Sequence, residues 1–203
     1  MDDVRARRQT DEQIERFRAA QEVVTRAGLR PRWIHLANSA ALASRPETWG
    51  NLVRPGIALY GCLACPNDLA LQPVLSLKTR ILSLRHAGAG TPLGYNARYV
   101  TPGPQRIAAI AAGYAHGVNR LLTNCGAALV RGRRAPMVGV VSMDLTLLDV
   151  TAVPGAAVGD EVTLIGRDGQ EEITADEVAA LAGTISYEIF CHIGKRVTRI
   201  YTS

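Results

Sequence analysis

The chain has 203 residues, and 47% of them are hydrophobic, which is enough to bury one large or two small cores. No apolar run approaches the roughly 18 residues that a membrane-spanning helix needs. The amino terminus is charged and polar where a signal peptide requires an apolar stretch. We therefore predict a cytoplasmic protein that does not insert into membranes.

The net charge of +5 results from 23 Lys and Arg against 18 Asp and Glu. Basic residues are scattered among acidic ones, whereas a nucleic-acid-binding protein gathers them on one face together with aromatic residues. The composition therefore argues against nucleic acid as a partner.

The four cysteines leave two interpretations open. Cys62 and Cys65 form a C-x-x-C pair, but no second pair follows at the spacing of a zinc ribbon, and Cys125 and Cys191 stand alone. A metal or redox site is one interpretation, and small apolar residues kept reduced in the cytosol is the other. We favour the second and predict no metal site.

The first thirty residues are predicted to form a helix. Ile14, Phe17, Ala20 and Val24 recur at near-helical spacing, and Gly28 is the expected end. A short strand is predicted at Trp33–Leu36, followed by a helix that Asn38 or Ser39 caps, and then by a second strand at Ala58–Tyr60. These are two β-α units.

A closed (β/α)8 barrel needs eight strands and about 250 residues, so residues 1–70 are predicted to be an incomplete segment containing its last two β-α units. Residues 71–203 are predicted to form a carboxy-terminal β domain, because short apolar runs alternate there with Gly and Pro. The predicted strands are Ser76–Leu84, Arg106–Ala111, Ala127–Val130, Met137–Val141, Thr146–Val150, Glu161–Ile165 and Arg196–Tyr201. One helix, Thr174–Leu181, is expected among them, with Thr174 and Glu177 forming a capping box.

Several segments resemble the alanine racemase family, in the order in which that family has them. They are H-L-A-N-S-A-A at 35–41, V-R-P-G-I-A-L-Y-G at 53–61, P-V-L-S-L-K-T-R-I at 73–81, L-G-Y at 93–95, G-Y-A-H-G at 113–117, A-P-M-V-G-V-V-S-M-D at 135–144 and T-I-S-Y-E-I at 184–189. The resemblance implies an isomerase that interconverts L- and D-alanine with pyridoxal 5'-phosphate as cofactor.

The resemblance implies that Ser39, Gly56 and Ile57 bind the cofactor phosphate, together with the hydroxyl of Tyr187. The last two units of a barrel are a usual place for such a phosphate site. Taken alone, residues 54–57 are typical of a simple turn. Tyr187 taken alone is typical of a core tyrosine with a satisfied hydroxyl.

Arg54 is expected to face the pyridine nitrogen of the cofactor. A guanidinium does not give up its proton, so the ring would stay neutral and accept electrons less strongly than a protonated ring. His35 is expected to orient Arg54 by a hydrogen bond, and the alternative for His35 is a partly buried strand histidine.

Racemisation requires two acid/base groups on opposite sides of the cofactor. The resemblance implies that Tyr95 is one of them, and that the lysine covalently bound to the cofactor is the other. The only lysines are Lys78 and Lys195, and neither lies in the early strand-to-helix turn where the family has it. The covalent lysine is therefore absent from this chain.

The backbone N–H of Met143 is expected to meet the substrate carboxylate, with Asp144 supporting the same turn. The alternative for Met143 is a buried residue that fills a gap in the core. Tyr114 and Arg120 are expected to line the substrate entrance. Two departures from the family occur in this part of the chain: His116 replaces an acid, and Val140 replaces a common arginine.

In the family, the β domain of one subunit completes the barrel site of another, so the expected partner is a second copy or a complementing amino-terminal racemase segment. Two hypotheses follow from the missing half. Either the chain is part of a racemase that is active only with that half, or it is a non-catalytic remnant whose β domain pairs with an intact racemase.

Overall fold

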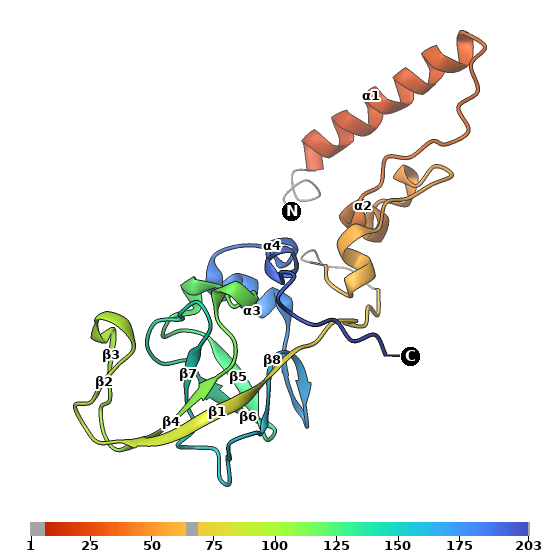
Figure 1. Ribbon diagram of the computed structural model, residues 1–203. Coiled ribbons are helices and arrows are strands. Elements are labelled where there is room, and N and C mark those ends of the chain that lie inside the picture. The colour runs from red at the N-terminus through yellow and green to blue at the C-terminus, as the bar shows by residue number, and fades with distance from the viewer. Residues whose placement is uncertain (1–6, 64–68, 203) are drawn as a thin grey trace. The chain divides into compact units, whose positions relative to one another are not determined.

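The computed structural model describes residues 7–63 and 69–202 (Figure 1). The chain divides into two compact units, residues 1–74 and residues 75–203. The sequence places the boundary after residue 70. Cys65 lies outside the described residues, so the C-x-x-C motif of Cys62 and Cys65 has no structural description.

The first unit begins with helix α1, Arg7–Arg26, as predicted. Gly28 follows with a φ of 75°, a left-handed conformation that ends the helix. Ile14 is the buried residue of α1, whereas Phe17 and Val24 are half-buried and Ala20 is exposed. The apolar stripe of this helix is therefore covered only in part within residues 1–74.

Helix α2, Ser39–Ser44, is capped by Asn38, whose Oδ1 accepts a hydrogen bond of 2.9 Å from the backbone N–H of Ala41. Two 3-10 helices follow, η1 at Pro46–Thr48 and η2 at Gly56–Tyr60.

The predicted strands at Trp33–Leu36 and Ala58–Tyr60 are wrong. The first segment is irregular, and the second lies within η2. A parallel strand needs neighbouring strands to satisfy its backbone, and the described part of residues 1–74 contains no strand. Pro55, with φ −77° and ψ 10°, instead starts the 3-10 turn.

The second unit is built on an antiparallel sheet with the strand order β6-β5-β8-β1-β4-β7, and β9 pairs with β8 (Figure 1). Its strands are β1 Leu77–Ala87, β4 Gln105–Ile110, β5 Ala127–Val130, β6 Arg133–Pro136, β7 Thr146–Asp149, β8 Glu161–Asp168 and β9 Glu171–Ile173. A separate hairpin pairs β2, Pro92–Leu93, with β3, Tyr99–Val100. The predicted β-rich carboxy-terminal domain is confirmed.

Two strand predictions fail in this domain. Met137–Val141 forms only a single bridge, from Met137 to Leu148, because Gly139 turns the chain away at a φ of 76°. Arg196–Tyr201 is irregular, and Ile200 within it is 83% exposed. An apolar alternation does not form a strand where no neighbouring strand lies beside it.

Helix α3, Ala175–Ala182, begins where the sequence predicts, with Thr174 Oγ1 accepting a hydrogen bond of 3.0 Å from the N–H of Glu177. The reciprocal half of the capping box is absent, since the Glu177 carboxylate binds Arg134 at 2.5 Å. Helix α4, Ser186–His192, follows and buries Ser186 and Ile189.

Candidate active site

In the first unit the structure brings Ser39 and Gly56 together. Ser39 is 2% exposed, and its Oγ accepts a hydrogen bond of 3.2 Å from the N–H of Ala58. A Cβ added to Gly56 would lie 3.8 Å from that Oγ. Among the described hydrogen bonds, the N–H groups of Gly56 and Ile57 have no acceptor. A hydroxyl and two free N–H groups therefore adjoin one another, which suits an anion.

Arg54 is held against the segment before α2 by hydrogen bonds to two backbone carbonyls of that segment. Its Nη2 donates to the carbonyl of Leu36 at 3.1 Å, and its N–H donates to the carbonyl of Ala37 at 3.0 Å. The expected hydrogen bond from His35 is not formed, because Arg54 uses the carbonyl of Leu36 instead. His35 Nδ1 is buried without a hydrogen-bond partner among the described residues.

In the second unit, Tyr95 lies in the turn of the β2–β3 hairpin and is 71% exposed. Leu93, at the base of this hairpin, is fully buried in a cluster with Ile107 and Val138. Gly94, which lies between Leu93 and Tyr95, has a φ of 71°, and this left-handed conformation turns the chain out of the core. The buried Leu93 therefore anchors the hairpin whose turn exposes the phenol of Tyr95.

Met143 lies at the tip of a turn that Ser142 closes. Ser142 donates through its N–H to the carbonyl of Leu145 at 3.0 Å, and its Oγ accepts from the N–H of Leu145 at 3.2 Å. Among the described hydrogen bonds, the N–H groups of Met143 and Asp144 have no acceptor. The Met143 side chain is 49% exposed, so the alternative of a buried gap-filling residue is wrong.

Tyr114 is attached directly to this turn. Its N–H donates to the carbonyl of Ser142 at 2.9 Å, and the N–H of Ala115 donates to the carbonyl of Met143 at 3.0 Å. A Cβ on Gly113 would lie 2.2 Å from the carbonyl oxygen of Ser142, so this approach requires glycine. The structure thus brings Tyr114 and Met143 together.

Arg120 begins the 3-10 helix η5, Arg120–Leu122, and is exposed. Its carbonyl accepts a hydrogen bond of 2.7 Å from Thr123 Oγ1. The same Oγ1 accepts from the N–H of Val141 at 3.3 Å. Arg120 is therefore connected to the segment that leads into the Met143 turn.

Asp144 forms an ion pair with Arg196, whose Nη2 lies 2.8 Å from Asp144 Oδ1. Oδ1 has no partner in hydrogen-bond geometry, so charge rather than a directed hydrogen bond defines this contact. Sequence reasoning missed Arg196, because a long-range ion pair leaves no local pattern.

Tyr187 lies on α4 and is 46% exposed, so the alternative of a core tyrosine is wrong. It belongs to the second unit, whereas Ser39, Gly56 and Ile57 belong to the first. Of the two lysines, Lys78 lies on β1 and pairs with Glu161 at 2.7 Å, and Lys195 is exposed near the carboxy terminus.

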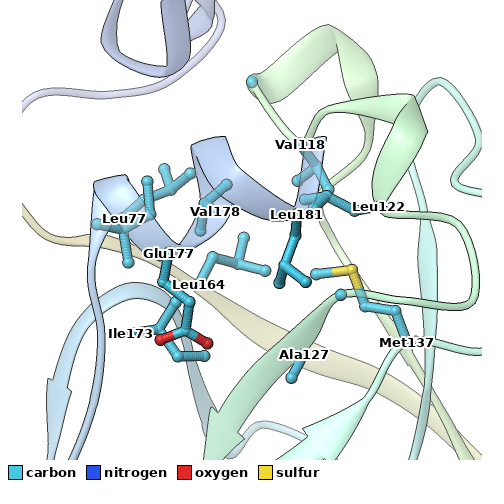
Figure 2. Close-up of a pocket in the computed structure, with 13 residues that line it drawn as sticks. Leu77, Val118, Leu122, Ala127, Met137, Leu164, Ile173, Glu177, Val178 and Leu181 are labelled. Carbon is cyan, nitrogen blue, oxygen red and sulfur yellow. The ribbon is translucent and has the colours of Figure 1, made fainter. Parts of the chain in front are cut away.

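An apolar pocket lies between α3 and the sheet, at a different place from these residues (Figure 2). Its lining includes Leu77, Val118, Leu122, Met137, Leu164 and Val178, and its one charged residue is Glu177. The hydrogen bond to Glu177 comes first among the interactions that raise the pKa of Arg134, followed by that to Glu171. The Glu177 carboxylate is paired with Arg134 and the rest of the lining is apolar, so this pocket belongs to the core of the domain.

In the part of the chain that the structure describes, three or more His, Cys, Asp or Glu side chains nowhere gather as metal ligands would. None of the helices there has the length and apolar character needed to cross a bilayer.

Two family models match this chain. The family model described as "Alanine racemase, C-terminal domain" matches residues 74–201, and the one described as "Alanine racemase, N-terminal domain" matches residues 1–64. The chain therefore belongs to the alanine racemase family.

Relatives of this chain are about twice as long. The alanine racemase of Geobacter sulfurreducens is 47% identical over 199 residues, which cover 96% of this chain and 52% of that protein. The crystal structure of the alanine racemase from D-cycloserine-producing Streptomyces lavendulae matches with a TM-score of 0.91 and 34% identity, over 96% of this chain and 52% of that one. The alanine racemase from Bartonella henselae with covalently bound pyridoxal phosphate matches with a TM-score of 0.82 and 33% identity, over 94% and 52%. The chain thus spans about half the length of these relatives.

Proposed function

We propose that the chain provides the carboxy-terminal half of a pyridoxal-phosphate-dependent alanine racemase. The observation that carries this proposal is the arrangement of Tyr95, Tyr114 and Met143, which are all exposed on short turns anchored in the β domain. Core side chains would not be presented in this way. In this proposal residues 1–70 join a barrel whose other parts belong to a complementing segment.

The residues of the first unit fit the phosphate of pyridoxal phosphate. Ser39 Oγ and the free N–H groups of Gly56 and Ile57 offer the donors that a phosphate needs, and the Tyr187 hydroxyl would add another. When bound, pyridoxal phosphate withdraws electrons from the amino acid and thereby acidifies its α-carbon. Arg54 would face the ring nitrogen, and a guanidinium there would limit this withdrawal.

Tyr95 would move the proton on one side of the substrate α-carbon. A phenol with an ordinary pKa of about 10 needs a nearby positive charge to act as a base near neutral pH. The opposite side needs a second group, and Lys78 on β1 is already paired with Glu161 on β8. In this proposal the lysine comes from the complementing segment.

The Met143 turn would hold the substrate carboxylate. Met143 and Asp144 present successive N–H groups that lack acceptors among the described residues, and such a pair attracts an anion. Arg196 offsets the charge of Asp144, which would otherwise repel the substrate. Tyr114 and Arg120 would flank the entrance beside this turn.

The proposed substrate is alanine, and the proposed location is the cytoplasm, where D-alanine would be made for peptidoglycan. The proposed assembly is a homodimer, or a complex with an amino-terminal racemase segment, in which the β domain of one subunit completes the barrel site of the other. Tyr95 and Met143 would then serve the partner's cofactor.

The second candidate function is association without catalysis. In this case the chain is a non-catalytic module whose β domain pairs with an intact racemase. Both candidates predict association, but only the first predicts that Tyr95 takes part in catalysis.

Growth of a bacterium that requires D-alanine separates the two candidates. The chain is co-expressed with the part of the Geobacter sulfurreducens racemase that precedes the matched region. We expect growth without D-alanine, loss of growth for Tyr95→Phe, and continued growth for Tyr201→Phe, since Tyr201 is 90% exposed and outside the site. Association of the two polypeptides without growth would overturn the racemase proposal in favour of the non-catalytic module.

A further inference from the structure

Asn124 occupies a junction between the segments that carry the proposed site residues. It follows η5 and adopts a φ of 62°, a left-handed conformation that asparagine tolerates better than most residues. Its Oδ1 accepts a hydrogen bond of 2.6 Å from the N–H of Gly139. Its Nδ2 donates to the carbonyl of Arg98 at 2.9 Å. One side chain therefore connects two backbone segments that are far apart in sequence.

The first of these segments carries Tyr95. Arg98 ends the 3-10 turn η3, Tyr95–Ala97, within the β2–β3 hairpin. The ladder of the hairpin pairs Pro92 with Val100 and Leu93 with Tyr99, and the N–H of Thr101 donates to the carbonyl of Thr91 at 3.0 Å at its base. A short two-stranded hairpin is marginally stable on its own, and these contacts lie at the end away from the Tyr95 turn. The orientation of the Tyr95 turn therefore depends on contacts outside the hairpin.

The second segment leads to Met143. Gly139 precedes it by four positions, and a Cβ added to Gly94 would lie 3.2 Å from the N of Val140. The hairpin and the 139–143 segment therefore already approach each other closely. Asn124 binds both segments, the hairpin through the carbonyl of Arg98 and the 139–143 segment through the N–H of Gly139. The Oγ1 of Thr123 accepts a further hydrogen bond of 3.3 Å from the N–H of Val141.

We propose that Asn124 is a positioning residue for racemisation, and that it fixes the Tyr95 phenol relative to the N–H groups of the Met143 turn. This inference rests on the proposed function. A proton-transfer group displaced by about 1 Å loses about 10²-fold in rate, so the two hydrogen bonds of Asn124 act on catalysis through Tyr95. Asn124 itself does not touch the reacting atoms.

Asparagine suits this position because the junction needs one acceptor and one donor on a short side chain. Aspartate keeps the acceptor for Gly139 but places a second oxygen against the carbonyl of Arg98. Glycine keeps the left-handed backbone and removes both hydrogen bonds. Asn124→Asp and Asn124→Gly therefore separate the two hydrogen bonds without straining the main chain.

The test uses a single polypeptide in which the amino-terminal half of the Geobacter sulfurreducens racemase precedes this chain. We expect Asn124→Gly to lower kcat for alanine by about 10–100-fold with a smaller change in KM, because the carboxylate-binding turn remains. We also expect a larger kinetic isotope effect with α-deuterated alanine, since proton transfer would become slower relative to the other steps. Asn124→Asp should give an intermediate loss.

Thr174→Ala is the matched control. It removes a helix cap in the same domain, with a loss of about 1 kcal/mol, and lies outside the proposed site. Its kcat should equal that of the parent. An Asn124→Gly protein with the kcat and isotope effect of the parent, or an equal loss of kcat in Thr174→Ala, would overturn the positioning role.

Amide hydrogen exchange of Gly139 in the chain itself tests the geometry without any activity. The exchange should be slow in the parent and fast in Asn124→Gly, and equal rates would overturn the inference. An inactive parent fusion would instead count against the proposed function, so the two failures are distinguishable.

Discussion

The guanidinium of Arg196 lies 2.8 Å from the carboxylate of Asp144 and ties the carboxy-terminal segment to the Met143 turn. The two side chains are 54% and 46% exposed, so the pair adds little to stability. Its effect is local and electrostatic, because Asp144 adjoins the N–H groups proposed to receive the substrate carboxylate. Neutralising Asp144 removes a charge that would repel that carboxylate.

Replacing Arg196 is expected to weaken alanine binding. In the fusion with the amino-terminal half, Arg196→Gln should raise KM by about tenfold, equivalent to about 1.4 kcal/mol, with a smaller change in kcat. Steady-state kinetics check this. The double variant Arg196→Gln with Asp144→Asn should regain most of the lost affinity, and a double variant as weak as the single one would contradict the electrostatic role.

Removing the Ser39 hydroxyl is expected to weaken binding of the cofactor phosphate. Ser39→Ala in the fusion should lower the affinity for pyridoxal phosphate by about tenfold, because a hydrogen bond to a charged group is worth about 1.5–3 kcal/mol. An absorbance titration measures this. Affinity for pyridoxal, which lacks the phosphate, should be unchanged.

Ser44→Ala is the control for Ser39, since the Ser44 hydroxyl in the same helix donates to the carbonyl of Ala40 at 2.8 Å. This variant should bind pyridoxal phosphate as the parent does. Equal losses in both variants, or an equal loss for pyridoxal, would mean that Ser39 acts on the helix rather than on the phosphate.

Gly113→Ala is expected to separate Tyr114 from the Met143 turn. The added Cβ would meet the Ser142 carbonyl oxygen at 2.2 Å, so the backbone must move, at a cost of about 1–3 kcal/mol. Denaturant unfolding of the chain measures this loss. Gly103→Ala is the control, because a Cβ there meets nothing within 4 Å. Equal stability of the two variants would contradict the close approach.

The stability contribution of Glu47 is expected to depend on pH. A hydrogen bond from its own backbone, followed by one from Arg45, lowers the pKa of Glu47 below its ordinary value of 4.5. A group with a lowered folded pKa stabilises the fold above its unfolded pKa and loses that contribution as the pH falls through the folded value. The stability difference between the parent and Glu47→Gln should therefore be constant near neutral pH and should shrink below pH 4.5. A difference that stays constant in acid would contradict this.

Local patterns predicted much of the β domain, because strands such as β5 are short apolar runs with turn residues at both ends. They failed at Met137–Val141, where Gly139 turns the chain away from β7, and at Arg196–Tyr201, where no neighbouring strand lies beside the segment among the described residues. In the first unit the same factor left Trp33–Leu36 irregular. The spacing of apolar residues predicts which face of a segment is buried. It does not show which strands lie beside that segment.

The candidate site was predictable only through ordered motifs, since Tyr95 and Met143 have no distinctive local pattern. Asn124 and Arg196 were missed because their partners, Arg98, Gly139 and Asp144, are distant in sequence. The bond between His35 and Arg54 was expected but not formed, because the carbonyl of Leu36 accepts from Arg54. Side-chain contacts of this kind depend on the final backbone path.

The most direct test of the central claim is loss of the α-proton signal of L-alanine by NMR in D₂O with pyridoxal phosphate. The chain together with its amino-terminal half should exchange this proton far faster than free pyridoxal phosphate. Tyr95→Phe should reduce the rate by about 10²–10⁴-fold, the usual contribution of a general acid/base group. Exchange by Tyr95→Phe at the parent rate would contradict the claim that this chain supplies a proton-transfer group of the racemase.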